Sequence, residues 1–217
     1  MTGYTLVNVL GGCLIITSML VLLSKTPRKG AKLYALQSLV LVGIFLALAT
    51  TTGSTDLYEW SATAFVTKVL VVPGVLLYAA KKIGVSDTEL SAKITPATAI
   101  VLVAVEVFVC FMVIGSVQLP TAAEVKPALA ISLAHFFIGI TCIVTQRNIF
   151  KQIFGYCLME NGSHVTLALL APQAPGLVET GVATDAFLAV IIMVVVAVRI
   201  YRVAHTIDAD DLMELKG

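Results

Sequence analysis

The sequence contains little charge for its length. Of its 217 residues, 12% are charged, about half of the roughly 25% that is usual in a soluble domain. The hydrophobic fraction is 59% and the mean hydropathy is +0.99. These values exclude an ordinary soluble domain, and also a disordered chain, which combines low hydrophobicity with high net charge. The net charge of only +1 argues against nucleic acid as a partner.

The sequence also lacks the motifs of soluble enzymes. It contains no phosphate-binding glycine loop, no nucleophile elbow and no iron–sulfur spacing of cysteines. None of its four cysteines belongs to a CxxC pair, so we expect small buried side chains rather than disulfides or metal ligands. They are Cys13, Cys110, Cys142 and Cys157. We therefore expect a non-catalytic chain without a cofactor or a metal. Any redox centres would lie in partner subunits.

Long apolar segments are abundant instead. A membrane-spanning helix needs about 20 mostly apolar residues, and in lipid such a segment must be helical to satisfy its own backbone. A membrane β-barrel would show alternating segments of about ten residues, and none is present. Seven apolar runs occur, at 6–23, 33–50, 60–80, 97–117, 128–144, 149–170 and 177–201. We predict an all-α integral membrane protein with seven transmembrane helices.

The basic residues favour one orientation in the bilayer. All but two of the 14 Lys and Arg residues fall on one side of the predicted spans. They are Lys25, Arg28, Lys29, Lys32, Lys81, Lys82, Lys93, Arg147, Lys151, Arg199, Arg202 and Lys216. By the positive-inside rule, the amino terminus is outside and the carboxyl terminus is cytoplasmic. Because positive charge follows the first run rather than preceding it, we expect a retained helix, not a cleaved signal peptide.

Six ionisable side chains lie within the predicted spans. They are Lys68, Glu106, His135, Glu160, His164 and Asp185. Such residues cost about 2.5–3.5 kcal/mol each on insertion scales and are usually functional. Because six groups of mixed sign are distributed over five helices, we predict a buried, hydrated proton path. The alternative is a set of purely structural ion pairs, such as Lys68 with Glu106 or with Asp185.

The predicted helix 149–170 has the densest polar chemistry. Glu160 and His164 are four residues apart, so they share a helix face and can touch. A carboxylate beside an imidazole in low dielectric can relay protons. Two other readings stay open: Glu160 and His164 as half of a metal site, and His135 with His164 as haem ligands. Both lack an accompanying ligand cluster.

A helix disruption is expected close to the buried lysine. Pro73 follows Lys68 by five residues and cannot donate to the carbonyl of Val69. Gly74 loosens the same turn further. The freed carbonyl suits a polar pocket around the ammonium, and a simple packing kink is the alternative.

The carboxyl-terminal part resembles a known family. The segments QRNIF at 146–150 and IFGYCLMEN at 153–161 resemble the second helix of the small three-helix membrane subunit of respiratory complex I. They also resemble the matching subunit of multisubunit sodium/proton antiporters. The helix that begins with ATDAF at 183–187 resembles the third helix of that family. The likeness covers 127–217, so we expect a four-helix part at 1–126 and a three-helix module at 127–217 with a short cytoplasmic tail.

Over its full length, the chain is similar to component E of hydrogenase-4-type membrane complexes. That resemblance implies a multi-pass subunit of a formate hydrogenlyase-like complex in the inner (plasma) membrane of a bacterium. Its partners would be antiporter-like membrane subunits and a peripheral hydrogenase arm on the cytoplasmic side. The implied roles are proton translocation and anchoring. The alternatives are a structural scaffold, a subunit of a sodium/proton antiporter-type complex and a free-standing small-solute transporter.

The resemblance also suggests residue roles. Where the three-helix family carries a glutamate in its second helix, this chain has Cys157, and Glu160 follows about 5 Å further along the helix axis. Where that family has a glutamate in its third helix, this chain has Asp185. Glu160 and Asp185 would be the central proton carriers. His164 and His135 would be relays, with Lys68 and Glu106 as an accessory charged pair. From its polar, acidic composition alone, the tail 203–217 is expected either to rest on a cytoplasmic neighbour or to be a frayed end.

Overall fold

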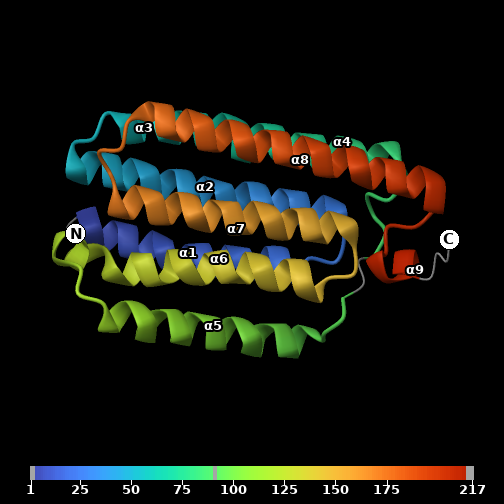
Figure 1. Ribbon diagram of the computed structural model, residues 1–217, viewed down its shortest axis with the longest axis horizontal. Coiled ribbons are helices and arrows are strands. Elements are labelled where there is room, and N and C mark those ends of the chain that lie inside the picture. Colours follow the sequence, from blue (N-terminus) through green and yellow to red (C-terminus); the bar gives the residue numbers. More distant parts are fainter. Residues whose placement is uncertain (1–2, 90–91, 214–217) are drawn as a thin grey trace.

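The computed structural model describes residues 3–89 and 92–213, which form a bundle of long helices lying side by side (Figure 1). Its helices are α1 (Gly3–Leu22), α2 (Pro27–Thr52), α3 (Asp56–Ala64), the π-helix η1 (Phe65–Val71), α4 (Val72–Lys82), α5 (Pro96–Ser116), the 3-10 helix η2 (Pro120–Val125), α6 (Lys126–Thr145), α7 (Ile149–Leu170), α8 (Gly176–Ala204) and α9 (Ala209–Met213). The described residues contain no strand, only two isolated bridges. The all-α prediction is therefore confirmed for this part of the chain.

Six helical segments are long and apolar enough to cross a membrane. Within the described ranges they are Gly3–Leu22, Pro27–Thr52, Asp56–Lys82, Pro96–Ser116, Ala123–Thr145 and Thr180–Ala204. The remaining predicted span coincides with α7, which has 22 residues but is less apolar. Glu160, Asn161 and His164 interrupt its hydrophobic sequence. Seven spans therefore remain a prediction.

The most polar long helix lies innermost in the bundle. α7 packs against α6 along most of its length and also contacts α2, α8 and α1. By contrast, α5 packs mainly on α6, and α8 covers the opposite side of the bundle with α3 and α4 (Figure 1). Polar side chains on α7 would be costly against lipid, so burying this helix shields them.

Glycines allow the central helices to approach closely. A Cβ added at Gly155 would lie 2.8 Å from the carbonyl oxygen of Gly139 and 2.9 Å from the amide nitrogen of Ile143. At Gly162, an added Cβ would lie 2.5 Å from the amide nitrogen of Phe136. Small residues permit such backbone contact between membrane helices, where packing rather than water drives association. The interface between α6 and α7 therefore depends on these glycines.

Local sequence signals fix the ends of the helices. Thr26 precedes α2 and accepts a hydrogen bond from the amide of Lys29 at 3.3 Å, with Pro27 in the first helical position. This arrangement satisfies a free amide at the helix start. Gly53 ends α2 in the left-handed region at φ 69°, where a residue without a Cβ is favoured.

One end of the bundle gathers the basic residues and is called the basic end here. It contains the carboxyl-terminal ends of α1, α4, α6 and α8 and the amino-terminal ends of α2, α5 and α7. Lys151 belongs to this end in sequence, yet its side chain is buried. Its Nζ donates to the carbonyls of Leu22 at 2.5 Å and Val21 at 3.2 Å, and so caps α1 with a positive charge. Lys216 and the side chain of Glu179 lie outside the described residues.

The tail folds back onto the chain at the basic end. The amide of Ala209 donates to the carbonyl of Arg147 at 2.7 Å, and the amide of Ile149 donates to the carbonyl of Ile207 at 3.0 Å. Arg147 also pairs with Asp208 at 3.2 Å and with Asp210. The hydrogen bond that Arg147 donates to the Asp208 carboxylate raises the pKa of the Arg147 guanidinium above its ordinary value. The described part of the tail therefore rests on the loop between α6 and α7.

The glycine contacts can be tested by adding one methyl group. In Gly155→Ala the new Cβ meets the backbone of α6, which cannot move aside as a flexible side chain can. We expect the free energy of unfolding to fall by about 1–3 kcal/mol, the usual cost of overpacking. Reversible unfolding of the purified chain in mixed micelles measures this loss.

Gly115→Ala in α5 is the matched control. No atom lies within 4 Å of a Cβ built there, so we expect an unchanged or slightly higher stability, because Ala favours helix over Gly. Equal losses in the two variants would contradict a role for close approach between α6 and α7.

Candidate functional site

Lys68 lies in a locally widened helix inside the bundle. The amide of Val72 donates to the carbonyl of Thr67, five residues earlier, as in a π-helix. The expected disruption before Pro73 thus takes the form of η1. Single π-helical turns within longer helices often occur at functional sites. The side chain of Lys68 is 4% exposed, so its ammonium must be compensated by protein groups.

Four side chains form a buried ion-pair cluster, defined here as Lys68, Glu160, Asn161 and His164. The Nζ of Lys68 donates to Glu160 Oε1 at 2.5 Å and Oε2 at 2.6 Å, and to Asn161 Oδ1 at 2.8 Å. The Nδ1 of His164 lies 2.5 Å from both Lys68 Nζ and Glu160 Oε1. The predicted contact between Glu160 and His164 is therefore confirmed. Lys68, from a distant part of the chain, completes the site.

A pair of amides connects this cluster to a second histidine. Asn161 Nδ2 donates to Gln37 Oε1 at 2.8 Å, and Gln37 Nε2 lies 3.3 Å from His135 Nε2. On its other side, His135 Nδ1 lies 2.5 Å from Ser18 Oγ, which donates to the carbonyl of Leu14. Asn161, Gln37, His135 and Ser18 are fully buried. A continuous polar chain thus runs from η1 through α7, α2 and α6 to α1.

The order of donors and acceptors along this series of hydrogen bonds fits a neutral imidazole at His135. Nε2 of His135 accepts from Gln37, and Nδ1 donates to Ser18, whose own proton goes to Leu14. Side-chain amides donate and accept hydrogen bonds but do not titrate. The amides of Asn161 and Gln37 therefore hold the cluster and His135 in register while separating them as titrating groups.

Gln37 and Asn161 are site residues that the sequence interpretation missed. Both are neutral amides, whereas the predicted proton path rests on ionisable side chains alone. Their signal is a carboxamide in the middle of a run otherwise suited to lipid. Such side chains form hydrogen bonds between membrane helices, so they also indicate an interior helix face.

Glu106 lies at a different interface. Thr141 on α6 donates a hydrogen bond to Glu106 Oε1 on α5. The expected pair of Lys68 and Glu106 is wrong, because Lys68 pairs with Glu160 instead. The physical reason is helix placement: α5 and the α3–α4 segment lie on opposite sides of the bundle (Figure 1).

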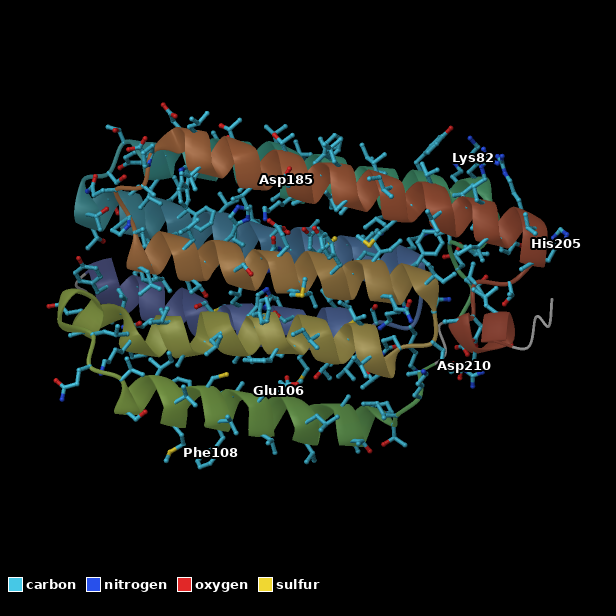
Figure 2. The ribbon with its side chains drawn as sticks, viewed as in Figure 1. Lys82, Glu106, Phe108, Asp185, His205 and Asp210 are labelled. Carbon is cyan, nitrogen blue, oxygen red and sulfur yellow. The ribbon has the colours of Figure 1, made fainter. Side chains whose placement is uncertain are left out.

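Asp185 lies on the exposed face of α8, outside the ion-pair cluster. Figure 2 shows Asp185 and Glu106 on opposite sides of the bundle. The alternative pair of Lys68 with Asp185 is therefore not formed. The inner face of α8 does adjoin the cluster, because Phe187 lines the same small pocket as Lys68 and Glu160.

The polar groups do not assemble a metal centre. Over residues 3–89 and 92–213, no group of three or more His, Cys, Asp and Glu side chains could hold a metal ion. Haem ligation by His135 would compete with its two existing contacts, since both ring nitrogens face Ser18 or Gln37. The arrangement instead suits proton exchange among Lys68, Glu160 and His164, which lie within hydrogen-bond distance of one another.

Two comparisons place the chain in a family. Residues 127–217 match the family model of NADH-ubiquinone/plastoquinone oxidoreductase chain 4L. Hydrogenase-4 component E of Escherichia coli strain K12 is 51% identical over 217 residues, which is 100% of both chains. The chain belongs to the hydrogenase-4 component E family. The protein of that name from Shigella flexneri shows the same 51% identity and full coverage.

Membership of the hydrogenase-4 component E family confirms the resemblance inferred from the sequence. An uncharacterized protein of Mycobacterium tuberculosis is also similar, at 32% identity over 79 residues, or 36% of each chain. No solved structure matches the chain significantly. The matched range 127–217 contains Glu160, His164 and Asp185 but not Lys68. The division into parts at 1–126 and 127–217 stays a prediction.

The ion-pair cluster predicts a strong dependence between two substitutions. Lys68→Met leaves the Glu160 carboxylate buried without its cation, which should lower the free energy of unfolding by about 3–5 kcal/mol. Adding Glu160→Gln removes the stranded charge, so the double variant should recover most of the loss. Reversible unfolding in mixed micelles measures both values.

Lys32→Met is the control for this cycle, because Lys32 is exposed at the basic end. We expect a change within about 0.5 kcal/mol, as for ordinary surface substitutions. Additive losses in the double variant would contradict a direct interaction between Lys68 and Glu160.

Proposed function

We propose that the chain is an integral membrane subunit of a bacterial membrane-bound hydrogenase complex of the formate hydrogenlyase type. In this proposal it contributes to proton translocation and anchors the complex in the inner membrane, while partner subunits hold the redox centres. The 51% identity to hydrogenase-4 component E over the full chain supports the assembly. The buried ion-pair cluster is the observation that carries the proton-translocating role.

The proposed arrangement has seven spans, with the amino terminus outside and the basic end in the cytoplasm. α7 would be the seventh span: its 22 residues correspond to about 33 Å of helix, close to the thickness of the hydrocarbon core. Its polar face is covered by α6, α2 and α8, so α7 meets little lipid. The basic residues at one end of the bundle support the orientation.

Proton exchange in this proposal uses the three titratable groups of the cluster. A proton that reaches the Glu160 carboxylate from the α8 side neutralises it and weakens its attraction for Lys68. The ammonium then gives a proton to Nδ1 of His164, 2.5 Å away, and recovers one from the Glu160 carboxyl group. Lys68 and Glu160 then have their starting charges again, and His164 carries the added proton as an imidazolium until it passes the proton on. His135 is proposed as a second relay, held by Gln37 and Ser18 on the far side of the amides.

The two acids outside the cluster have a place in the same proposal. Asp185 and Glu106 lie on α8 and α5, the helices at the two sides of the bundle (Figure 2). We propose that they exchange protons with neighbouring antiporter-like subunits. A potential of 100 mV is worth about 2.3 kcal/mol per proton moved across, so small free-energy differences between these carboxylates matter.

A structural scaffold is the second candidate, and one observation favours it. Lys68 Nζ already has close acceptors in Glu160, Asn161 and His164, so the pair is complete as a clamp between η1 and α7. In that case the charges stabilise the fold and the complex, and no proton passes through them.

Glu160→Gln distinguishes the two candidates. The amide keeps the size of the side chain and an acceptor for Lys68 but cannot take up a proton. We expect the complex to assemble and to evolve hydrogen, while proton pumping coupled to that reaction falls to background. Proton uptake by inverted membrane vesicles, normalised to assembled complex, measures the effect.

Glu59→Gln is the matched control, since Glu59 is exposed in α3 far from the cluster; its pumping should equal that of the unmodified complex. Unchanged pumping in assembled Glu160→Gln complex would refute the proton role. Lower yield with intact specific activity and pumping would support the scaffold.

The proposed orientation predicts the accessibility of introduced thiols. A membrane-impermeant maleimide applied to intact cells should label Glu59→Cys, at the end of the bundle opposite the basic end. Lys29→Cys should be labelled only after the membrane is opened. The unmodified chain, with its four cysteines, supplies the background. The reverse pattern would contradict the orientation.

A further inference from the structure

A groove with apolar walls runs between α4 and α8 on the outer surface of the bundle. Its walls include Val75 on α4 and Ile191, Val195 and Val198 on α8. Val195 is 54% exposed, so the groove is open to the surroundings. α8 touches the bundle only lightly here, since its contacts are divided among α3, α4 and α7. The groove therefore marks a gap in the packing of α8.

Cations surround the mouth of this groove at the basic end. Lys82 ends α4, and Arg199 and Arg202 lie in the last turns of α8; all three are exposed and line the groove. In the described ranges none of the three forms an ion pair with an acid. By contrast, Arg147 and Lys93 at the same end are paired with Asp210.

An aromatic ring holds one of these cations in place. Lys82 Nζ lies 5.6 Å from the centre of the Tyr78 ring, a distance typical of cation–π attraction. Tyr78 lines the same groove and is 66% exposed. Figure 2 shows Lys82 beside the final turns of α8. The three positive charges therefore gather where apolar walls meet the basic end.

We propose that the α4–α8 groove binds an anionic phospholipid. Its acyl chains lie along the valine and isoleucine walls, and its phosphate is held by Lys82, Arg199 and Arg202. Basic pockets between membrane helices on the cytoplasmic side suit anionic headgroups. The charge favours one occupant: a partner helix could cover the apolar walls, whereas an anionic headgroup also complements three exposed cations that no acid within the described residues pairs with.

The bound lipid has a structural consequence for α8. The lipid fills the gap between α4 and α8 and supplies packing that the chain itself does not provide. Because α8 also covers the pocket beside Lys68 and Glu160, the lipid secures the outer wall of the ion-pair cluster. The site stands independently of the proton-translocating role, since it depends only on the groove and its basic rim.

Native mass spectrometry of the full-length chain in mild detergent tests the site with cardiolipin and phosphatidylethanolamine as probes. We expect cardiolipin to bind more tightly than zwitterionic phosphatidylethanolamine. In Arg199→Gln/Arg202→Gln the cardiolipin affinity should fall about 25-fold, from a loss of about fivefold for each basic residue near a phosphate. Lys29→Gln/Lys32→Gln removes two charges at the same end away from the groove and should leave the affinity unchanged.

A second variant tests the apolar walls alone. Val195→Trp fills the groove without altering any charge, and we expect it to weaken cardiolipin binding. In the unmodified chain, excess inorganic phosphate should not displace bound cardiolipin. Equal losses of cardiolipin affinity in the two double charge variants would overturn the proposal. The lipid would then be attracted by the overall positive charge of the basic end and not by the groove. Unchanged affinity in Val195→Trp, or displacement of the lipid by excess inorganic phosphate, would also overturn it, because the rim would then bind a free anion without acyl chains.

Discussion

A buried ammonium in a bundle of apolar helices must find its counter-charge within the protein, and much of this structure follows from that requirement at Lys68. The carboxylate of Glu160 supplies the charge, and Asn161 and His164 supply further acceptors. These three residues lie on α7, so α7 must lie beside η1 in the interior of the bundle. The glycines of α7 then allow α6 to pack closely against it, which excludes lipid from the α6 side of α7.

The buried polar side chains are of two kinds, namely titratable groups and amides that hold them in position. Lys68, Glu160 and His164 can exchange protons over short distances, whereas Gln37 and Asn161 only orient their neighbours. His135 is held from both sides by hydrogen bonds, which fix its ring between α1 and α2. Such a connected network favours one helix arrangement over others, because a slip between helices would break several buried hydrogen bonds at once.

The two outer helices have a different character from the core. α5 and α8 expose long apolar faces, and Glu106 on α5 and Asp185 on α8 lie away from the central cluster. In a subunit of a larger membrane complex, these helices are the natural meeting points with neighbours and lipid. α8 is pivotal in both proposals, since one face covers the ion-pair cluster and one edge forms the groove with α4. In these proposals, lipid binding and proton exchange therefore involve the same helix.

The sequence by itself determined the elements and the inventory of polar groups. Its apolar runs located the long helices, and its ionisable residues within them included Lys68, Glu160 and His164. The contact of Glu160 with His164 was predictable because the helical repeat fixes which residues share a face. Only the tertiary structure decided that Lys68 meets Glu160 rather than Glu106, that amides join the cluster to His135, and that Asp185 lies outside it. Those relations join separate helices, and their neighbours depend on how whole helix surfaces pack, including the glycine contacts of α6 with α7, which no spacing along one helix encodes.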